Sequence, residues 1–122
     1  AAAGWRIGVV TNAPRANAEA MLAAIGLAGR FPAIVAEGDA PRGKPDPAPY
    51  ALGLSLLGAT AETALAFEDS VPGVTAASGA GIFTVGLRSS LSDGPLRAAG
   101  AALTLRDFAD PGLEAALARL PA

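Results

Sequence analysis

Leu65-Ala-Phe-Glu68-Asp69-Ser70-Val-Pro-Gly73 is the segment of this chain that says most about its fold and its chemistry. Its apolar start is typical of a buried β-strand, which ends abruptly in two adjacent carboxylates before a turn with glycine. Such carboxylates repel each other and lose hydration, so a cation held between their oxygens explains the pair best. Glu68 and Asp69 are therefore predicted to bind Mg²⁺. The alternative is a solvated strand end whose acids stabilise the next helix through its dipole.

Short apolar runs alternate with helical patterns along the rest of the chain. The runs predict strands at residues 7–10, 33–36, 64–67, 82–85 and, at an edge, 101–105. Helices are predicted from Pro14 through Ile25 to Gly26, from Asp46 to Gly58, from Ser70 to Gly79, and from Asp110 onward. The proline-rich segment 37–49 and the serine-rich segment 88–94 are predicted loops. This order predicts an α/β fold, a three-layer Rossmann-like parallel sheet with helices on both faces.

Composition restricts the classes of function that the chain can perform. Its 122 residues suffice for one domain with one core, and its net charge of -2 with scattered basic residues argues against nucleic acid as a partner. It has no cysteine and no histidine, so carboxylates, hydroxyls and lysine must carry any chemistry. The longest uncharged segment, 70–87, is interrupted by proline and glycine, so no membrane-spanning segment is predicted. Because the first residues do not form a signal peptide either, a cytoplasmic location is expected.

Thr11 and Asn12 follow the first apolar run, where a strand gives way to a helix. Ligands of such sheets bind beyond the carboxyl ends of the strands, so these residues are expected to lie near Glu68 and Asp69. Their hydroxyl, amide and backbone N–H groups could surround an anionic oxygen. An ordinary helix start is an equally good interpretation of Thr11 and Asn12 taken alone.

Lys44 lies in the proline-rich loop, between Gly43 and Pro45. Restricted backbone freedom would hold its ammonium group in place with less loss of conformational entropy, although a solvated lysine is the alternative. Asp46 is predicted to start the following helix and not to bind metal. An anion-binding strand end, a placed lysine and an acidic pair are the electrostatic parts of a phosphoryl-transfer site. One part is missing, because no strand of this chain ends in an Asp-x-Asp pair that could supply a nucleophile.

Three motifs together resemble the C-terminal half of the core domain of the haloacid-dehalogenase-like (HAD) hydrolase superfamily, especially its phosphatase and beta-phosphoglucomutase-like branch. They are Val9-Val-Thr11-Asn12, Gly43-Lys44-Pro45-Asp46-Pro47 and Phe67-Glu68-Asp69-Ser70-Val-Pro-Gly73, and their order and spacing agree with the family. The resemblance implies that Thr11 and Asn12 hold the transferring phosphoryl group, that Lys44 neutralises its charge, and that Glu68 and Asp69 bind Mg²⁺. The family's first motif, Asp-x-Asp on the central strand, and its helical cap have no counterpart in this chain.

Residues 1–122 are therefore expected to form the C-terminal part of one HAD-like core domain that lacks the N-terminal strand and the cap. The intact protein would be a magnesium-dependent phosphatase that acts on a small phosphomonoester through an aspartyl-phosphate on an Asp outside this segment. The segment alone is expected to be inactive and unstable, with an open gap in its sheet. A phosphomutase of the same branch and a non-catalytic phosphate-binding domain are the alternatives. A receiver-like signalling module fits less well, because its acids would precede the hydroxyl and the lysine in the chain.

Overall fold

Strands and helices alternate along residues 6–24, 26 and 33–120, which the computed structural model describes. In chain order the elements are β1 (Gly8–Val10), α1 (Arg15–Ala24), β2 (Ala33–Val35), α2 (Ala48–Leu57), the short 3-10 helix η2 (Ala61–Thr63), β3 (Leu65–Glu68), α3 (Val71–Gly79), β4 (Phe83–Leu87), α4 (Asp93–Ala99), β5 (Leu103–Leu105) and α5 (Gly112–Leu117). The α/β class is confirmed, and the predicted strand bounds differ by one or two residues. Ile25, expected in the first helix, lies outside the described residues.

The helix boundaries have local causes that the sequence indicated. The Ser70 hydroxyl accepts a hydrogen bond from Gly73 N–H at 3.1 Å and so caps the start of α3. Asp46 Oδ1 accepts one from Ala48 N–H at 2.9 Å where α2 begins. Gly58 ends α2 in the left-handed region, with φ of 64°, which favours glycine. These residues behave as predicted.

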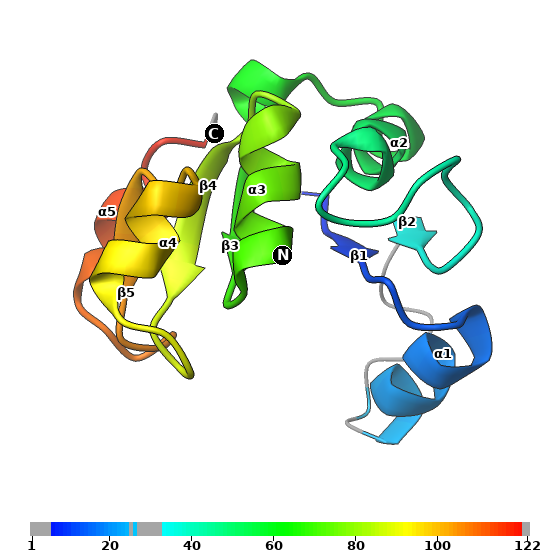
Figure 1. Cartoon of the computed structure of the whole chain (residues 1–122), viewed down its shortest axis with the longest axis horizontal. Coiled ribbons are helices and arrows are strands. Elements are labelled where there is room, and N and C mark those ends of the chain that lie inside the picture. The colour runs from blue at the N-terminus through cyan, green and yellow to red at the C-terminus, as the bar shows by residue number, and fades with distance from the viewer. Residues whose placement is uncertain (1–5, 25, 27–32, 121–122) are drawn as a thin grey trace.

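All strand pairs in the described part of the chain are parallel, but they form two separate sheets (Figure 1). β1 pairs with β2, with Val9 opposite Ile34. β4 lies between β3 and β5, with Phe67 of β3 opposite Val85. β1 and β3 therefore each present an edge that pairs with no other described strand. The single sheet that the sequence predicts is thus interrupted between these two strands.

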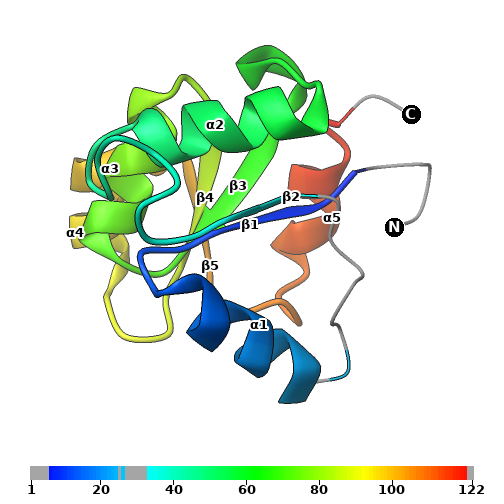
Figure 2. The ribbon, with the colours of Figure 1, turned by 90° about the vertical axis from the view of Figure 1, so that its right-hand side faces the viewer.

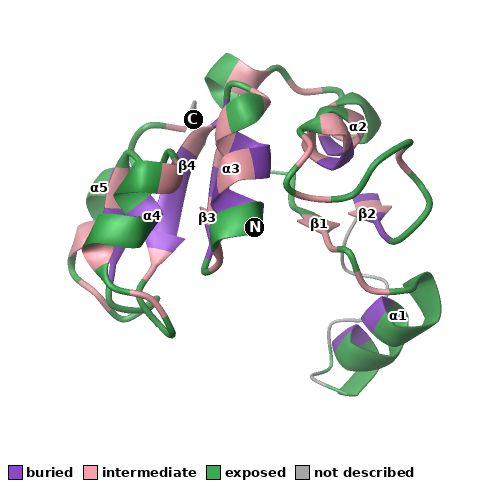
Figure 3. Ribbon diagram, in the orientation of Figure 1, coloured by how far each residue is buried: buried purple, intermediate pink, exposed green. Residues whose placement is uncertain are grey.

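Helices cover both faces of the strands. Figure 2 shows α2 and α1 on opposite sides of β1 and β2. One core cluster joins α3 to β3 through Ala77 and Ala66, with Ile82 between them, and another joins α5 to β4 and β5 through Ala116, Val85 and Leu105. Figure 3 shows buried positions concentrated on the strands and on α3. The three-layer arrangement is the one that the sequence predicts.

One α-helix was missed, as was the short 3-10 helix η2. The segment 88–94 was predicted to be a loop, but Asp93 and Gly94 already belong to α4. This helix has seven residues and one fully buried side chain, Leu96, so it shows no apolar periodicity. Asp93 accepts hydrogen bonds from Thr104 of β5 and Arg97, and both partners lower the pKa of its carboxyl. None of the described helices has the length and apolar character needed to cross a membrane.

Candidate active site

Glu68, the last residue of β3, brings the Lys44 motif and the Glu68-Asp69 motif together. Its carboxylate is buried, and Oε2 accepts a hydrogen bond from Lys44 Nζ at 2.6 Å. The side chains of Lys44 and Glu68 keep only 12% and 10% of their exposure, so water screens this ion pair weakly. The alternative of a solvated lysine is therefore wrong. The proline-rich loop thus holds the lysine against the acid, a contact that the sequence did not indicate.

Tyr50 of α2 is a site residue that sequence reasoning missed. Its hydroxyl donates a hydrogen bond to Oε2 of Glu68, the oxygen that Lys44 also contacts. Burial first, then the charge of Glu68 and the hydrogen bond to it, raise the pKa of Tyr50 above that of an ordinary phenol. The available signal was its hydroxyl, because a buried tyrosine usually has a hydrogen-bond partner.

The loop after β1 is tied to the loop that carries Lys44. Asn12 Oδ1 accepts a hydrogen bond from Lys44 N–H at 2.9 Å, and Asn12 Nδ2 donates to the Lys44 carbonyl at 3.3 Å. Gly43 leaves room for this contact, since a Cβ there would lie 2.8 Å from Asn12 Oδ1. Thr11 Oγ1 accepts from Ala13 N–H at 3.1 Å. The Thr11-Asn12 motif and the Lys44 motif thus meet, while the phosphate-binding role of Thr11 and Asn12 stays a prediction.

Arg15 lies outside this cluster, although it begins the helix that follows Asn12. It donates to the Ile34 carbonyl at 2.8 Å and to Asp39 Oδ2 at 2.5 Å. The Ala36 N–H and Arg15 lower the pKa of the Asp39 carboxyl. Arg15 thus fastens the loop after β2.

Asp69 differs from its neighbour Glu68 because it is exposed. It follows β3 directly, and its Oδ2 accepts a hydrogen bond from Ser89 Oγ at 3.3 Å. One acid is therefore buried and held by two donors, whereas the other reaches solvent. The two side chains that looked equivalent in the sequence have different surroundings.

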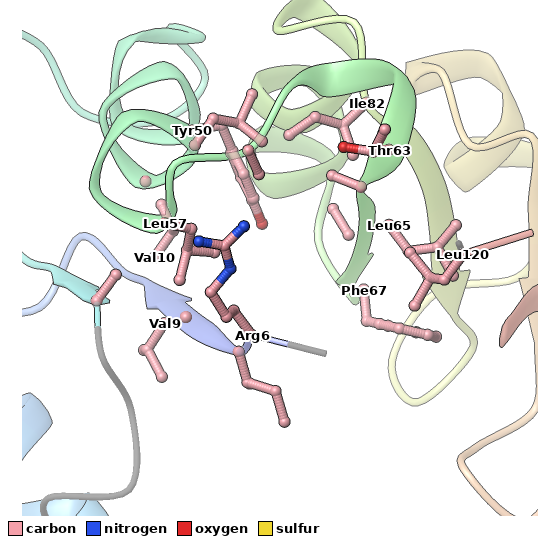
Figure 4. Close-up of a pocket in the computed structure, with 18 of the residues that line it drawn as sticks. Arg6, Val9, Val10, Tyr50, Leu57, Thr63, Leu65, Phe67, Ile82 and Leu120 are labelled. Carbon is pink, nitrogen blue, oxygen red and sulfur yellow. The ribbon is translucent and has the colours of Figure 1, made fainter. Parts of the chain in front are cut away.

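A cavity of about 850 Å³ occupies the gap between the two sheets. Apolar side chains of β1, α2, β3 and the C-terminal segment line it, among them Val9, Leu57, Phe67 and Leu120 (Figure 4). The Tyr50 ring also points into the cavity. Thr11 and Glu68 lie at the carboxyl ends of the two strands that flank it. Of the candidate site residues, Glu68 and Tyr50 line this cavity, whereas Thr11 and Asn12 line a separate pocket of about 260 Å³.

Comparison with known proteins assigns the chain to a family. Residues 1–81 match the family model described as haloacid dehalogenase-like hydrolase. The chain belongs to the haloacid dehalogenase-like hydrolases. This HAD-like chain is 40% identical over 84 residues to validoxylamine A 7'-phosphate phosphatase from Streptomyces hygroscopicus subsp. limoneus. The matched region covers 69% of the chain and 39% of that relative. It is 38% identical over 112 residues to phosphoglycolate phosphatase from Rhodospirillum rubrum, and this match covers 92% of the chain and 46% of the relative.

The HAD-like fold also occurs in solved structures. CbbY from Rhodobacter sphaeroides, in complex with xylulose-(1,5)bisphosphate, superposes with a TM-score of 0.78 at 35% identity over 90% of this chain and 50% of that one. Beta-phosphoglucomutase from Clostridium difficile shares the fold, with a TM-score of 0.79 at 23% identity over 93% of this chain and 48% of that one. The chain therefore spans half the length, or less, of these relatives and structures.

The acids of the HAD-like site are of the type that binds Mg²⁺, but two of them are too few to form a complete magnesium site. Carboxylate oxygens are the ligands that this ion prefers, and Glu68 and Asp69 both carry them at one strand end. Within the described ranges no three His, Cys, Asp or Glu side chains come together to hold a metal ion. The pair could therefore supply part of a magnesium site. A further carboxylate would have to come from elsewhere, since this chain has no Asp-x-Asp pair.

Gly73, in the first turn of α3, leaves the space that the Glu68 side chain fills. A Cβ at Gly73 would lie 1.9 Å from Glu68 Oε1, too close for any side chain. We expect Gly73→Ala to displace the carboxylate and to weaken Mg²⁺ binding by the full-length protein about 10 to 100-fold. Calorimetric titration with Mg²⁺ measures this.

Gly94→Ala in α4 is the matched control, because a Cβ at Gly94 would meet no atom within 4 Å. Its Mg²⁺ affinity should equal that of the unaltered protein. An unchanged Mg²⁺ affinity in Gly73→Ala would show that Mg²⁺ binding does not depend on the observed position of the Glu68 side chain.

Proposed function

We propose that this chain supplies the phosphate-binding and metal-binding side of a magnesium-dependent phosphatase that acts on a small phosphomonoester. The contact between Lys44 and Glu68 carries the proposal, because it joins two separate motifs in a buried ion pair at 2.6 Å. A buried ammonium group stabilises negative charge more strongly than a solvated one. The named activities of the relatives, both phosphatases, support the same class of reaction.

Each site residue has a proposed role in this reaction. Thr11, Asn12 and Lys44 would hold the transferring phosphoryl group and neutralise its charge, and Glu68 and Asp69 would bind Mg²⁺. The ion, when bound, would stabilise the charge on the phosphate oxygens. Asn12 would also hold its own loop against the loop of Lys44, through its two hydrogen bonds to the Lys44 backbone.

The gap between β1 and β3 is the proposed location of the missing catalytic part. Within each sheet the strands are parallel, and β1 and β3 present edges that pair with no other described strand to an apolar cavity, which a further strand would fill. Its carboxyl end would arrive beside Thr11 and Glu68. We propose that residues 1–122 are one part of a HAD-like core domain and that the same polypeptide supplies this strand, with the nucleophilic Asp and the third carboxylate for Mg²⁺.

A phosphomutase of the same branch would use the same site, and the fold shared with beta-phosphoglucomutase supports that alternative. The two reactions differ in the acceptor of the phosphoryl group, which is water in a phosphatase and a sugar phosphate in a mutase. A non-catalytic phosphate-binding domain would need neither the strand nor a nucleophile. The cytoplasmic location stays a prediction from the sequence.

The complete polypeptide should release inorganic phosphate from a panel of phosphomonoesters that includes phosphoglycolate and sugar phosphates. We expect release to require Mg²⁺ and to stop when EDTA removes it. Conversion of a sugar phosphate to its isomer without net phosphate release would identify a mutase. Phosphate binding without turnover of any compound would contradict the enzymatic proposal.

A further inference from the structure

Two donors from different elements converge on one oxygen of Glu68. Lys44 Nζ approaches Oε2 from the proline-rich loop, and the Tyr50 hydroxyl approaches it from α2. In the proposed function, Lys44 would contact the phosphate oxygens as well. If Lys44 were the only donor to Glu68, any shift of its ammonium group toward the substrate would leave a buried carboxylate without a partner, which is costly.

We propose that Tyr50 is a positioning residue, whose hydroxyl keeps the Glu68 carboxylate in place for the metal while Lys44 is free to engage the phosphoryl group. This inference rests on the proposed function. It assigns to Tyr50 a contact with Glu68 that does not depend on the substrate. Tyr50 itself would touch neither the substrate nor the ion.

The surroundings of Tyr50 suit this role. Its ring packs against the core cluster of Ala66, Ala77 and Ile82, so the hydroxyl is carried by a side chain with little freedom to move. Lys44 Nζ lies 5.5 Å from the centre of the same ring, close enough for a cation–π interaction. Tyr50 thus contacts both members of the ion pair through two different parts of its side chain.

Tyr50→Phe separates these contributions, because phenylalanine keeps the ring and its cation–π contact but removes the hydroxyl. In the complete polypeptide we expect Mg²⁺ affinity, measured by calorimetry without substrate, to fall about tenfold. At saturating substrate and subsaturating Mg²⁺ the rate should fall, and added Mg²⁺ should restore most of it. KM for the phosphomonoester should stay unchanged, because Lys44 remains available to the phosphate.

Thr84→Val is the control for the loss of a buried hydroxyl away from the site. Thr84 is 1% exposed and donates to the Ile82 carbonyl at 2.9 Å. This variant should lower the melting temperature but leave Mg²⁺ affinity unchanged.

If Tyr50→Phe binds Mg²⁺ as tightly as the unaltered enzyme, while that enzyme does bind Mg²⁺ and release phosphate, Tyr50 has no positioning role and the proposed function stands. If the unaltered enzyme binds no Mg²⁺, both the proposed function and this inference fail. A tenfold loss in Tyr50→Phe, without a similar loss in Thr84→Val, supports the inference.

Discussion

Lys44→Ala is expected to lower kcat of the complete enzyme by about 10²–10³-fold, the usual cost of removing one preorganised charge or donor from such a site. The reason is that its ammonium group is buried and paired with Glu68, and so acts in a region that water screens weakly. Steady-state rates of phosphate release at saturating substrate measure the effect. An unchanged kcat would contradict any role for Lys44 in charge neutralisation.

The same substitution also threatens folding, and this effect must be separated from the effect on catalysis. Removing Lys44 leaves Glu68 with the Tyr50 hydroxyl as its remaining side-chain partner, and a broken buried ion pair commonly costs about 3–5 kcal/mol. A double variant, Lys44→Met with Glu68→Gln, removes both charges. It should recover most of the lost melting temperature without recovering kcat.

Asp69→Asn should lower Mg²⁺ affinity and kcat together by roughly 100-fold, because a neutral amide replaces an exposed carboxylate that the ion is expected to use. The fold itself should tolerate the change, since the side chain makes one long hydrogen bond, at 3.3 Å, to Ser89. Calorimetry with Mg²⁺ and rates measured over a range of Mg²⁺ concentrations separate weaker binding from slower turnover.

Asp107→Asn provides the matched control, because Asp107 is an exposed acid after β5 whose Oδ1 accepts from Ala109 N–H. An asparagine oxygen can accept the same hydrogen bond. This variant should keep the Mg²⁺ affinity and the kcat of the unaltered enzyme. Equal behaviour of Asp69→Asn and Asp107→Asn would show that Asp69 is not a ligand.

Most of the fold could be predicted because its signals are local. Apolar runs, the Ser70 cap and the left-handed Gly58 depend on neighbouring residues, so they can be recognised without tertiary contacts. The helix α4 could not be predicted, because its single fully buried residue, Leu96, packs in a cluster with Val74 and Ala101. A seven-residue helix of this kind depends on the surface that it covers more than on its own pattern.

The sequence by itself determined which residue types stand at the strand ends, and it contains no Asp-x-Asp pair. Only the tertiary structure decided which of these residues are buried and which side chains they contact. It buries Glu68 and exposes Asp69, and it adds Tyr50, which is 18 residues away from Glu68 in the chain. It also joins Asn12 to the backbone of Lys44 across 32 residues. Such contacts depend on how helices cross and pack on the strands, because a local pattern contains no information about which distant side chain will share an oxygen atom.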